Sequence, residues 1–268
     1  MSPTPALLAS GRPRIDIDGR RADRLEADLI RLEVRADAAG VAALEAVFLN
    51  WGNAERGREV DFVHFDTATL DFGKRLAIAF SLGEQTHTVF DGLITGLGAE
   101  YPELRPPELT ILAEDALAGL RYRRRTRLSE NSSDGDIAAR ILSDAGLQGG
   151  ERRSGASHVA LLQVNEDELS ALRGRSGDAL ITLHDGRVGI VEAANANAAP
   201  LRLTRENDLL RFSVLADLAH QRGEVRVHGY DVAAKEAIHE RADSAAIRPE
   251  AGLGRLGPEI VGRVFAEA

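Results

Sequence analysis

Seven histidines are the residues of this chain that are best suited to hold a metal ion. They are His64, His87, His158, His184, His220, His228 and His239. A zinc site on a helix needs two histidines four residues apart, so that both imidazoles lie on one face, and no pair has this spacing. His220 and His228 could meet across a hairpin, but no carboxylate is spaced to complete a site there. Cysteine is absent, so we predict neither a metal centre nor thiolate chemistry.

Two short motifs match loops that bind nucleotides or metal ions in other proteins. The segment 252–257 (GLGRLG) has the glycine spacing of a dinucleotide-binding loop, but a buried strand should precede it and the residues 248–251 (RPEA) do not predict one. We expect a flexible loop that leads to Pro258 in the first turn of a helix. Asp71-Phe72-Gly73 matches the metal-binding triplet of kinases, but without a catalytic loop or glycine lid it predicts a turn between strands. The sequence therefore predicts no cofactor.

Two further groups of residues could take part in hydrolysis. The stretch 155–159 (GASHV) is one glycine short of a nucleophile elbow and follows no apolar strand. Glu166, Asp167 and Glu168 could supply the paired carboxylates of glycoside hydrolysis, which lie on both sides of the bond that breaks. Adjacent residues of one helical turn point apart, however, and the helix dipole favours acidic residues at a helix start. We expect a solvated helix start there, no catalytic residue and no enzyme activity.

The densest group of basic residues is the segment 121–127 (RYRRRTR). Its arginines are Arg121, Arg123, Arg124, Arg125 and Arg127. Such a run could bind phosphate or single-stranded nucleic acid, but 42 acidic against 33 basic residues give a net charge of -9, which repels phosphate backbones and anionic lipids. Arginine is also enriched in protein interfaces. We therefore predict that these five arginines form a protein interface, with neither nucleic acid nor membrane as a partner; phosphate or nucleic-acid binding is the alternative.

Period-two patterns of apolar residues dominate the first 120 positions and predict half-buried strands. Their apolar residues are Ile30, Leu32 and Val34; Leu44, Ala46 and Phe48; Leu76, Ile78, Phe80 and Leu82; and Leu109, Ile111 and Ala113. Within a further strand, Thr88 to Leu97, Gly92 and Gly96 predict a bulge or a close backbone approach. Because no long helix separates these strands, we expect an antiparallel barrel or sandwich.

The apolar period changes to that of helices between about 115 and 200. Four apolar residues between Ile137 and Ala145 predict a helix with Ser133 or Asp134 as its N-cap and Gly146 at its end. A second short helix is expected from Asn165, where Glu168 would complete a capping box, to about Gly174.

The last third of the chain returns mainly to strand patterns. A hairpin is expected over 180–191 with its turn at Asp185-Gly186, followed by a linker over 193–199. Strands are then predicted at 209–215 and 224–227, and a helix at 232–242. The N-terminal segment lacks the pattern of a secretory signal, and the apolar stretches are far shorter than the roughly 20 residues of a bilayer span. We therefore expect a cytoplasmic chain.

Several segments, in the same order, resemble the hub proteins of contractile tails, which are the phage late control protein D family and the VgrG-like hubs of contractile injection systems. The segments are 90–97 (FDGLITGL), 108–115 (ELTILAED), 137–147, 162–167 (LQVNED), 185–186 (DG) and 221–231 (QRGEVRVHGYD). The resemblance runs from Pro13 to about Ala242. It departs from the family at 169–172 (LSAL), where a longer helix is usual, and in lacking the later strands that close a second barrel.

The resemblance implies a mainly β (β+α) fold, with two tube-like antiparallel β-barrel domains and a small α/β insert. We expect the first barrel at 1–120, the insert at 121–200, and the second barrel, incomplete at its C-terminal end, at 201–268. The implied function is that of a structural baseplate hub, a homotrimer that adapts a hexameric inner tube to a spike.

The expected partners are the inner tube protein, the spike protein, other baseplate subunits and a possible cargo. Such a hub stays in the cytoplasm of the producing bacterium within an assembled phage tail-like particle. A tail-associated cell-wall hydrolase is the enzymatic alternative.

Overall fold

The structure is a computed structural model of the 268-residue chain. It describes residues 11–37, 40–53, 60–64, 67–82, 85–177, 179–184, 186–192, 203–205, 209, 211–213, 215, 217–219, 222–232, 234–243 and 257–265. The chain divides into two compact units, Met1–Arg202 and Leu203–Ala268. Several expected features lie outside the described residues, namely the linker at 193–199, the turn residue Asp185, His220 and the glycine-rich loop up to Leu256.

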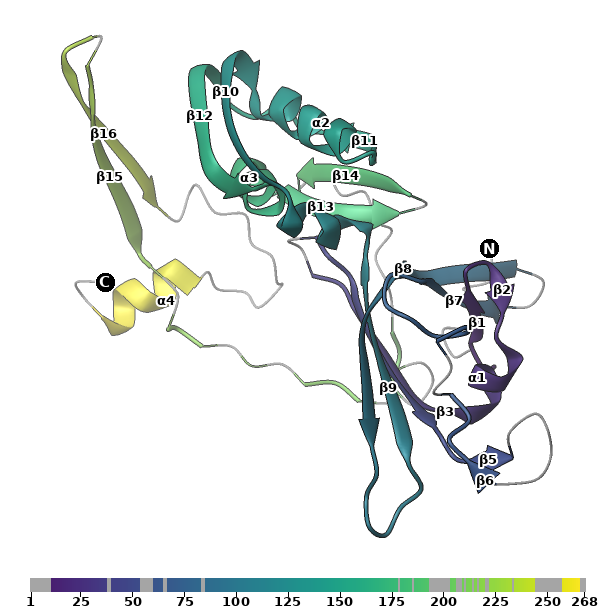
Figure 1. Cartoon of the computed structure of the whole chain (residues 1–268). Helices are drawn as coiled ribbons and strands as arrows, with labels where there is room; N and C mark the ends of the chain where they lie inside the picture. The colour runs from purple at the N-terminus through teal and green to yellow at the C-terminus, as the bar shows by residue number, and fades with distance from the viewer. Residues whose placement is uncertain are drawn as a thin grey trace. The chain divides into compact units, whose positions relative to one another are not determined.

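Seven antiparallel strands form the main sheet of the first unit (Figure 1). In spatial order they are β2 (Arg20–Arg21), β1 (Arg14–Ile17), β7 (Arg75–Leu82), β8 (Gln85–Glu100), β9 (Glu108–Asp115), β4 (Ala43–Leu49) and β3 (Leu29–Arg35). Helix α1 (Asp23–Asp28) leads from β2 into β3, and the short strands β5 (Gly52–Asn53) and β6 (Val60–Asp61) pair with each other. Strands β2 and β3 are the edges, so the described strands form an open sheet.

The core of the first unit's sheet lies on one face, and the alternation of apolar residues that places it there is clearest in β1 and β9. In β9, Leu109, Ile111 and Ala113 are buried, whereas Leu112 between them is 45% exposed. They pack with the buried residues of β1, β4, β7 and β8, and Leu25 of α1 packs against the same cluster. The strands predicted from the period-two patterns are all confirmed. Burial of one apolar face against a helix is what makes such a sheet stable in water.

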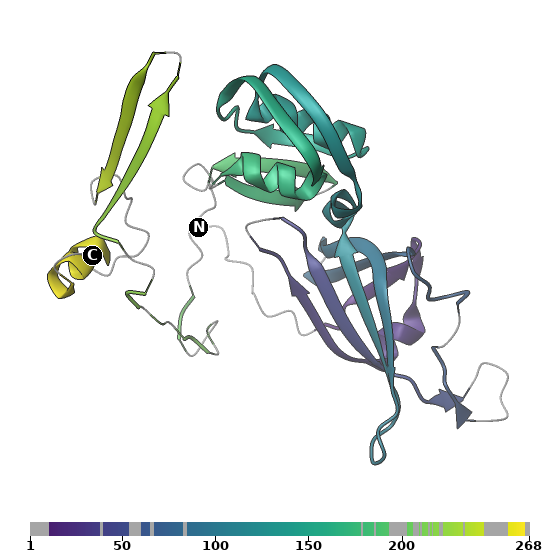
Figure 2. The ribbon, with the colours of Figure 1, turned by 60° about the vertical axis from the view of Figure 1, so that its left-hand side comes forward.

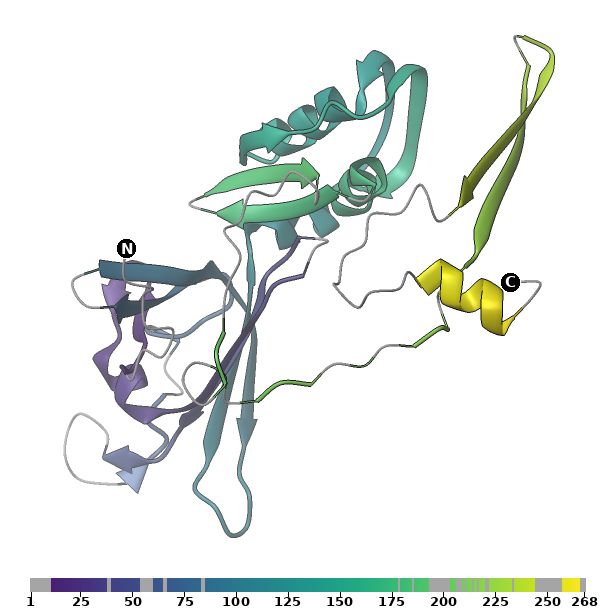
Figure 3. The same ribbon diagram turned by 180° about the vertical axis from the view of Figure 1, so that it is seen from behind.

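At Gly92, strand β8 lies very close to the backbone of β9. A Cβ atom at this position would lie 2.3 Å from the carbonyl oxygen of Glu114, far inside contact distance. The register between the two strands shifts between Ile94 and Gly96. The prediction for this strand was a bulge or a close backbone approach, and the structure has both. The bulge accompanies an unusually long hairpin, which extends beyond the rest of the sheet (Figure 1, Figure 3).

The α/β part of the first unit follows β9. Its elements are the 3-10 helix η1 (Ala116–Tyr122), β10 (Arg124–Ser133), α2 (Asp134–Asp144), β11 (Gln148–Arg152), β12 (Ser157–Asp167), α3 (Glu168–Ser176), β13 (Ala179–His184) and β14 (Arg187–Glu192). Strands β10 and β12 pair as an antiparallel ribbon, and β11, β14 and β13 form a second sheet in which β11 runs parallel to β14. A second apolar core forms between α2, α3, η1 and this sheet. The hairpin predicted at 180–191 is thus confirmed.

Asp115 joins the two parts of the first unit. Its carboxylate accepts a hydrogen bond from Leu117 N at 2.9 Å, which caps η1, and one from Ala42 N at 2.7 Å at the start of β4. Burial raises the pKa of this carboxyl, and the backbone donors of Ala42 and Leu117 offset part of that effect. One side chain therefore fixes where the main sheet ends and the α/β part begins.

The first predicted helix is confirmed, and the second begins later than expected. Ser133 and Asp136 form a complete capping box at the start of α2, whose end is followed by Gly146 at φ 72°. Helix α3 begins at Glu168 rather than Asn165, and its N-cap is Asp167. The reason is non-local, because β12 continues through Asn165, whose backbone N–H donates to Thr126 Oγ1 of β10 at 3.0 Å.

The second unit contains the hairpin of β15 (Glu224–Asp231) and β16 (Glu236–Asp243) and the helix α4 (Gly257–Val264). The predicted helix over 232–242 is wrong. Asp231 Oδ1 accepts a hydrogen bond from Ala234 N, and Lys235 has φ 56°, so the chain turns back and pairs with β15. The strand predicted at 209–215 is absent from its described residues, apart from an isolated bridge between Arg205 and Leu209. The helix around Pro258 is confirmed.

The mainly β class with a small α/β part is confirmed. The described strands close neither of the two tubes expected from the resemblance, since the main sheet ends in two edges and the second unit contributes one hairpin. Among the described residues, no helix has both the length and the apolar character that crossing a membrane requires.

Candidate protein interface

The five arginines of the segment 121–127 form ion pairs and hydrogen bonds with residues of β9, α2, β12 and α3. Arg121 pairs with Glu114 of β9, and Arg127 pairs with Asp144 of α2 at 2.5 Å. The other three contacts are Arg123 Nη1 with Asp144 O at 2.6 Å, Arg124 Nε with Asn165 O at 3.1 Å, and Arg125 Nε with Glu168 Oε1 at 3.6 Å. Arg123 and Arg127 thus both contact Asp144, while the other three arginines contact β9, β12 and α3. Whether they also meet another protein stays a prediction.

The ribbon of β10 and β12 presents apolar side chains to solvent next to these arginines. Figure 2 shows the two strands running side by side as a curved ribbon. Leu128 and Leu162 are directly opposite each other and are 52% and 61% exposed, and Val164 is 63% exposed. Exposed apolar residues that lie together, with arginines at their border, are typical of protein interfaces.

Three aromatic side chains meet at the end of the main sheet, and the sequence analysis did not find them as a group. Trp51 and Phe62 are in edge contact with ring centroids 5.7 Å apart, and Phe62 and Tyr101 are in edge contact at 6.1 Å. All three are exposed, as is Leu104 of the turn between β8 and β9, at 93%. We call Trp51, Phe62 and Tyr101 the aromatic cluster. Exposed tryptophan and tyrosine are the side chains that most often dominate binding energy at interfaces.

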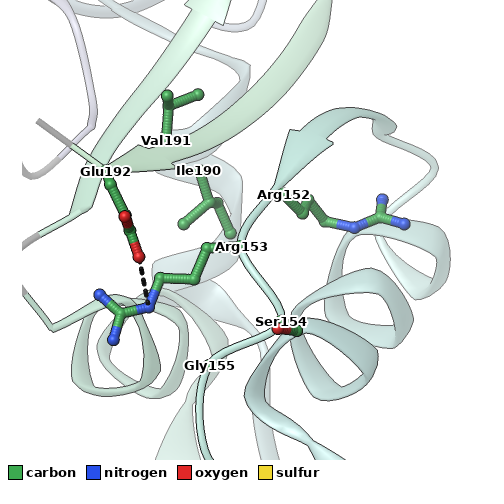
Figure 4. Close-up of a pocket in the computed structure, with 7 residues that line it drawn as sticks. All are labelled: Arg152, Arg153, Ser154, Gly155, Ile190, Val191 and Glu192. Carbon is green, nitrogen blue, oxygen red and sulfur yellow. Dashed lines mark ion pairs between the residues drawn. The ribbon is translucent and has the colours of Figure 1, made fainter. Parts of the chain in front are cut away.

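Three hollows formed by described residues differ in their linings. The first, of about 420 Å³, is lined by Arg152, Arg153 and Glu192 among others. Figure 4 shows Arg153 directed at Glu192, 3.8 Å away, while Arg152 points to the opposite side. A second hollow of about 620 Å³ is mostly apolar and lies where the main sheet meets the α/β part, next to Asp115. The third, of about 530 Å³, is lined by residues of α1 and the segment around His64.

The acidic residues 166–168 only partly form the solvated helix start that was predicted, since Glu166 lies in β12, Asp167 is the N-cap of α3 and Glu168 is the first residue of the helix. Asp167 Oδ1 accepts the backbone N–H of Ser170 at 2.9 Å, and this hydrogen bond lowers the pKa of Asp167. Glu168 is fully buried and lines none of the three hollows. Because Glu168 is buried while Glu166 is exposed, the two carboxyls do not face solvent together as a pair on both sides of a bond would.

Two histidines form ion-pair contacts with aspartates inside the first unit. His64 is buried, and its Nε2 lies 2.9 Å from Asp28 Oδ2. Burial lowers the pKa of His64, and Asp28 offsets part of this effect. His158 Nε2 lies 2.8 Å from Asp134 Oδ1, which holds the start of α2 against β12. Both pairs connect structural elements. No group of three or more metal-ligating side chains occurs in the described part of the chain.

Comparisons with known proteins agree on the kind of fold. The tail protein from Neisseria meningitidis MC58 is 12% identical, with a TM-score of 0.60, and the match covers 88% of this chain and 69% of that one. The prophage tail protein gp18 from Listeria monocytogenes is 8% identical, with a TM-score of 0.51, covering 89% and 70%. This chain therefore shares the fold of phage tail proteins.

One further solved structure matches a smaller share of this chain, and two other comparisons use the sequence alone. The 43 kDa tail protein of prophage MuSo2 from Shewanella oneidensis is 16% identical with a TM-score of 0.48, covering 68% of this chain and 54% of its own length. This chain thus spans about half of that protein. Among curated proteins none matches. A family model described as the Alg8 N-terminal domain matches residues 14–255.

Proposed function

This chain belongs to the Alg8 N-terminal domain family, and we propose that it is a structural baseplate hub of a phage tail or a contractile injection system. The observation that supports this most strongly is the phage tail-protein fold, which extends over nearly the whole chain. The sequence segments that resemble contractile-tail hubs lie in this same fold, on β8, β9, α2, β12 and β15.

As a hub, the protein forms a trimer that adapts a hexameric inner tube to a spike. We keep the proposed division into a first barrel at 1–120, an insert at 121–200 and a second barrel at 201–268. The edge strands β2 and β3, and the unpaired edges of the β15–β16 hairpin among the described residues, can be continued by strands of neighbouring subunits. A ring contact joins two different surfaces of identical subunits, so the aromatic cluster of one subunit meets another surface of the next.

The hub works without catalysis, inside a particle that assembles in the cytoplasm of the producing bacterium. Its buried Glu168 and His64 serve the packing of elements rather than a substrate. The partners are the inner tube protein, the spike protein, other baseplate subunits and a possible cargo, and not nucleic acid or a membrane. The net charge of -9 favours such protein partners over polyanions.

Native mass measurement of the purified full chain tests this proposal. We expect an assembly with three times the 28.8 kDa mass of one chain, and larger complexes when the inner tube and spike proteins of the same organism are added. A monomer or dimer that stays unchanged in the presence of both proteins would contradict it. Dilution over a hundredfold range distinguishes a weak trimer from a chain that does not associate.

A further inference from the structure

Two histidines face each other across the β15–β16 hairpin. His228 and His239 are directly opposite in the strand register, and their Nδ1 atoms are 2.6 Å apart. The rings meet edge to face, with centroids 4.9 Å apart. Both residues are exposed. A hydrogen bond between two Nδ1 atoms requires one protonated and one bare nitrogen, so the pair presents two nitrogen ligands that converge on one point.

The separation of these nitrogens is close to what a metal ion needs. Zinc binds histidine nitrogen at about 2.0–2.1 Å in tetrahedral geometry, which places two such nitrogens about 3.3 Å apart. The imidazoles must therefore open by only about 0.7 Å, a change that exposed side chains make by small rotations. To free both Nδ1 atoms, the ring that carries the shared proton on Nδ1 changes to the tautomer with its proton on Nε2, so the two imidazoles keep the same number of protons. Water can fill the remaining positions because the site is open to solvent.

The neighbouring charges do not oppose a cation. The next pair on the same face is Arg226 and Arg241, also directly opposite each other. Both guanidiniums are ion-paired with Glu224, and Arg241 also lies 3.7 Å from Asp243. These two carboxylates offset the two positive charges, so the electrostatic penalty for a cation beside His228 and His239 is small.

A metal ion that links β15 to β16 would also stabilise the hairpin. Almost every described residue of β15 and β16 is exposed, including the apolar Val225, Val227 and Ile238. An isolated two-stranded hairpin is only marginally stable in water. The chain has no cysteine with which to make a disulfide, and a metal ion is the other common means of tying a small structure together.

We propose that His228 and His239 form a two-histidine site for a divalent transition-metal ion such as Zn²⁺, which links β15 to β16. Imidazole ligands suit zinc, nickel and copper ions, and the last binds most tightly in the general affinity order. This inference concerns the second unit alone and does not depend on the proposed hub function.

Calorimetric titration of the metal-free full chain with ZnCl₂ tests the site. We expect saturable binding that His228→Asn and His239→Asn each weaken by about tenfold or more. His87→Asn removes a histidine of β8 that is also exposed and is the matched control; it should bind Zn²⁺ like the wild type. Absence of saturable binding to the wild type, or equal binding by all three variants, would overturn the proposal.

Hydrogen exchange of the backbone amides is a second test of Zn²⁺ binding, and it does not depend on the heat of binding. Zn²⁺ should slow exchange of the backbone amides of β15 and β16 in the wild type and in H87N, and chelation with EDTA should reverse this. The exposed substitutions at 228 and 239 leave the rest of the chain folded, so the exchange of β7, β8 and β9 serves as the internal reference. If Zn²⁺ slows exchange of the hairpin equally in H228N, the histidine pair is not the ligand.

Discussion

Arg125 of β10 holds its Nε 3.6 Å from Glu168, whose side chain has no exposed surface. Neither carboxyl oxygen of Glu168 receives a hydrogen bond from the described residues. The substitution Arg125→Ala should therefore lower the free energy of unfolding, measured in urea, by about 1–3 kcal/mol, because a buried carboxylate keeps its desolvation cost when its partner is lost. Since the Arg125 side chain is 49% exposed, water screens the pair and we expect the lower part of this range.

A double variant separates this structural role of Arg125 from a role in docking. R125A/E168M replaces the pair with apolar side chains, and such replacements are often neutral or stabilising. It should recover most of the lost stability. If R125A alone unfolds at the same urea concentration as the wild type, the contact with Glu168 contributes nothing, and the role of Arg125 must lie at the surface.

Gly92 and Gly98 offer a matched pair of substitutions on one strand, β8. Gly92→Ala places a Cβ atom 2.3 Å from the Glu114 carbonyl oxygen, which belongs to backbone and cannot move aside, whereas in Gly98→Ala the nearest atom is Thr110 Cβ at an ordinary 3.6 Å. We expect G92A to lose about 1–3 kcal/mol of stability, as overpacked sites do, and G98A to change it by less than about 0.5 kcal/mol. Equal urea midpoints for the two variants would contradict the close approach of β8 and β9.

The buried His64 should make the first unit less stable in acid. In the unfolded chain its imidazole takes up a proton near pH 6.5, while in the fold burial lowers the pKa of His64. Below pH 6.5 the unfolded chain therefore binds more protons, and the free energy of unfolding falls as the pH falls. His64→Gln removes this titration. We expect the difference in melting temperature between pH 7.5 and pH 5.5 to be smaller in H64Q than in the wild type; equal differences would show that His64 does not contribute.

The elements that the sequence predicted correctly are those whose signals are local. Helix α2 carries its capping box, Ser133 and Asp136, within its own first turn, and its apolar residues repeat at helical spacing. The strands of the main sheet alternate apolar and polar residues because one face is buried. Both kinds of signal can be recognised without knowing any distant partner.

The errors arose where a distant partner decides the structure. The residues of β16 favour a helix by composition, but the turn at Asp231 and Lys235 and pairing with β15 make them a strand. The pair of His228 and His239 could not be found from spacing alone, because it depends on the hairpin register. The aromatic cluster joins residues from three segments that are far apart in the sequence, so no local pattern indicates it.

The aromatic cluster should contribute to association and little to folding. Trp51 is 39% exposed and Tyr101 69% exposed, so Trp51→Ala and Tyr101→Ala should change the free energy of unfolding of the monomer by less than about 1 kcal/mol. At an interface, truncation of such anchors costs about 2 kcal/mol or more, so we expect the dissociation constant of the proposed trimer, measured by sedimentation, to rise at least about tenfold. Phe72→Ala is the control, since Phe72 is 64% exposed in the turn before β7 and outside the cluster. Oligomers of W51A and Y101A that dissociate like those of F72A would show that the cluster is not a subunit contact.

The arginine segment should fail to bind nucleic acid, because its guanidiniums are already engaged within the fold. Arg121 and Arg127 each pair with a carboxylate, and Arg123 and Arg124 donate to backbone carbonyls. Binding of phosphates would have to break these contacts and overcome the repulsion from a chain of net charge -9. We expect no shift of single-stranded DNA or RNA in a gel at 50 mM salt with micromolar protein. A shift that weakens steeply as salt is raised, and that disappears in Arg124→Ala, would mean that these arginines bind phosphate instead of a protein partner.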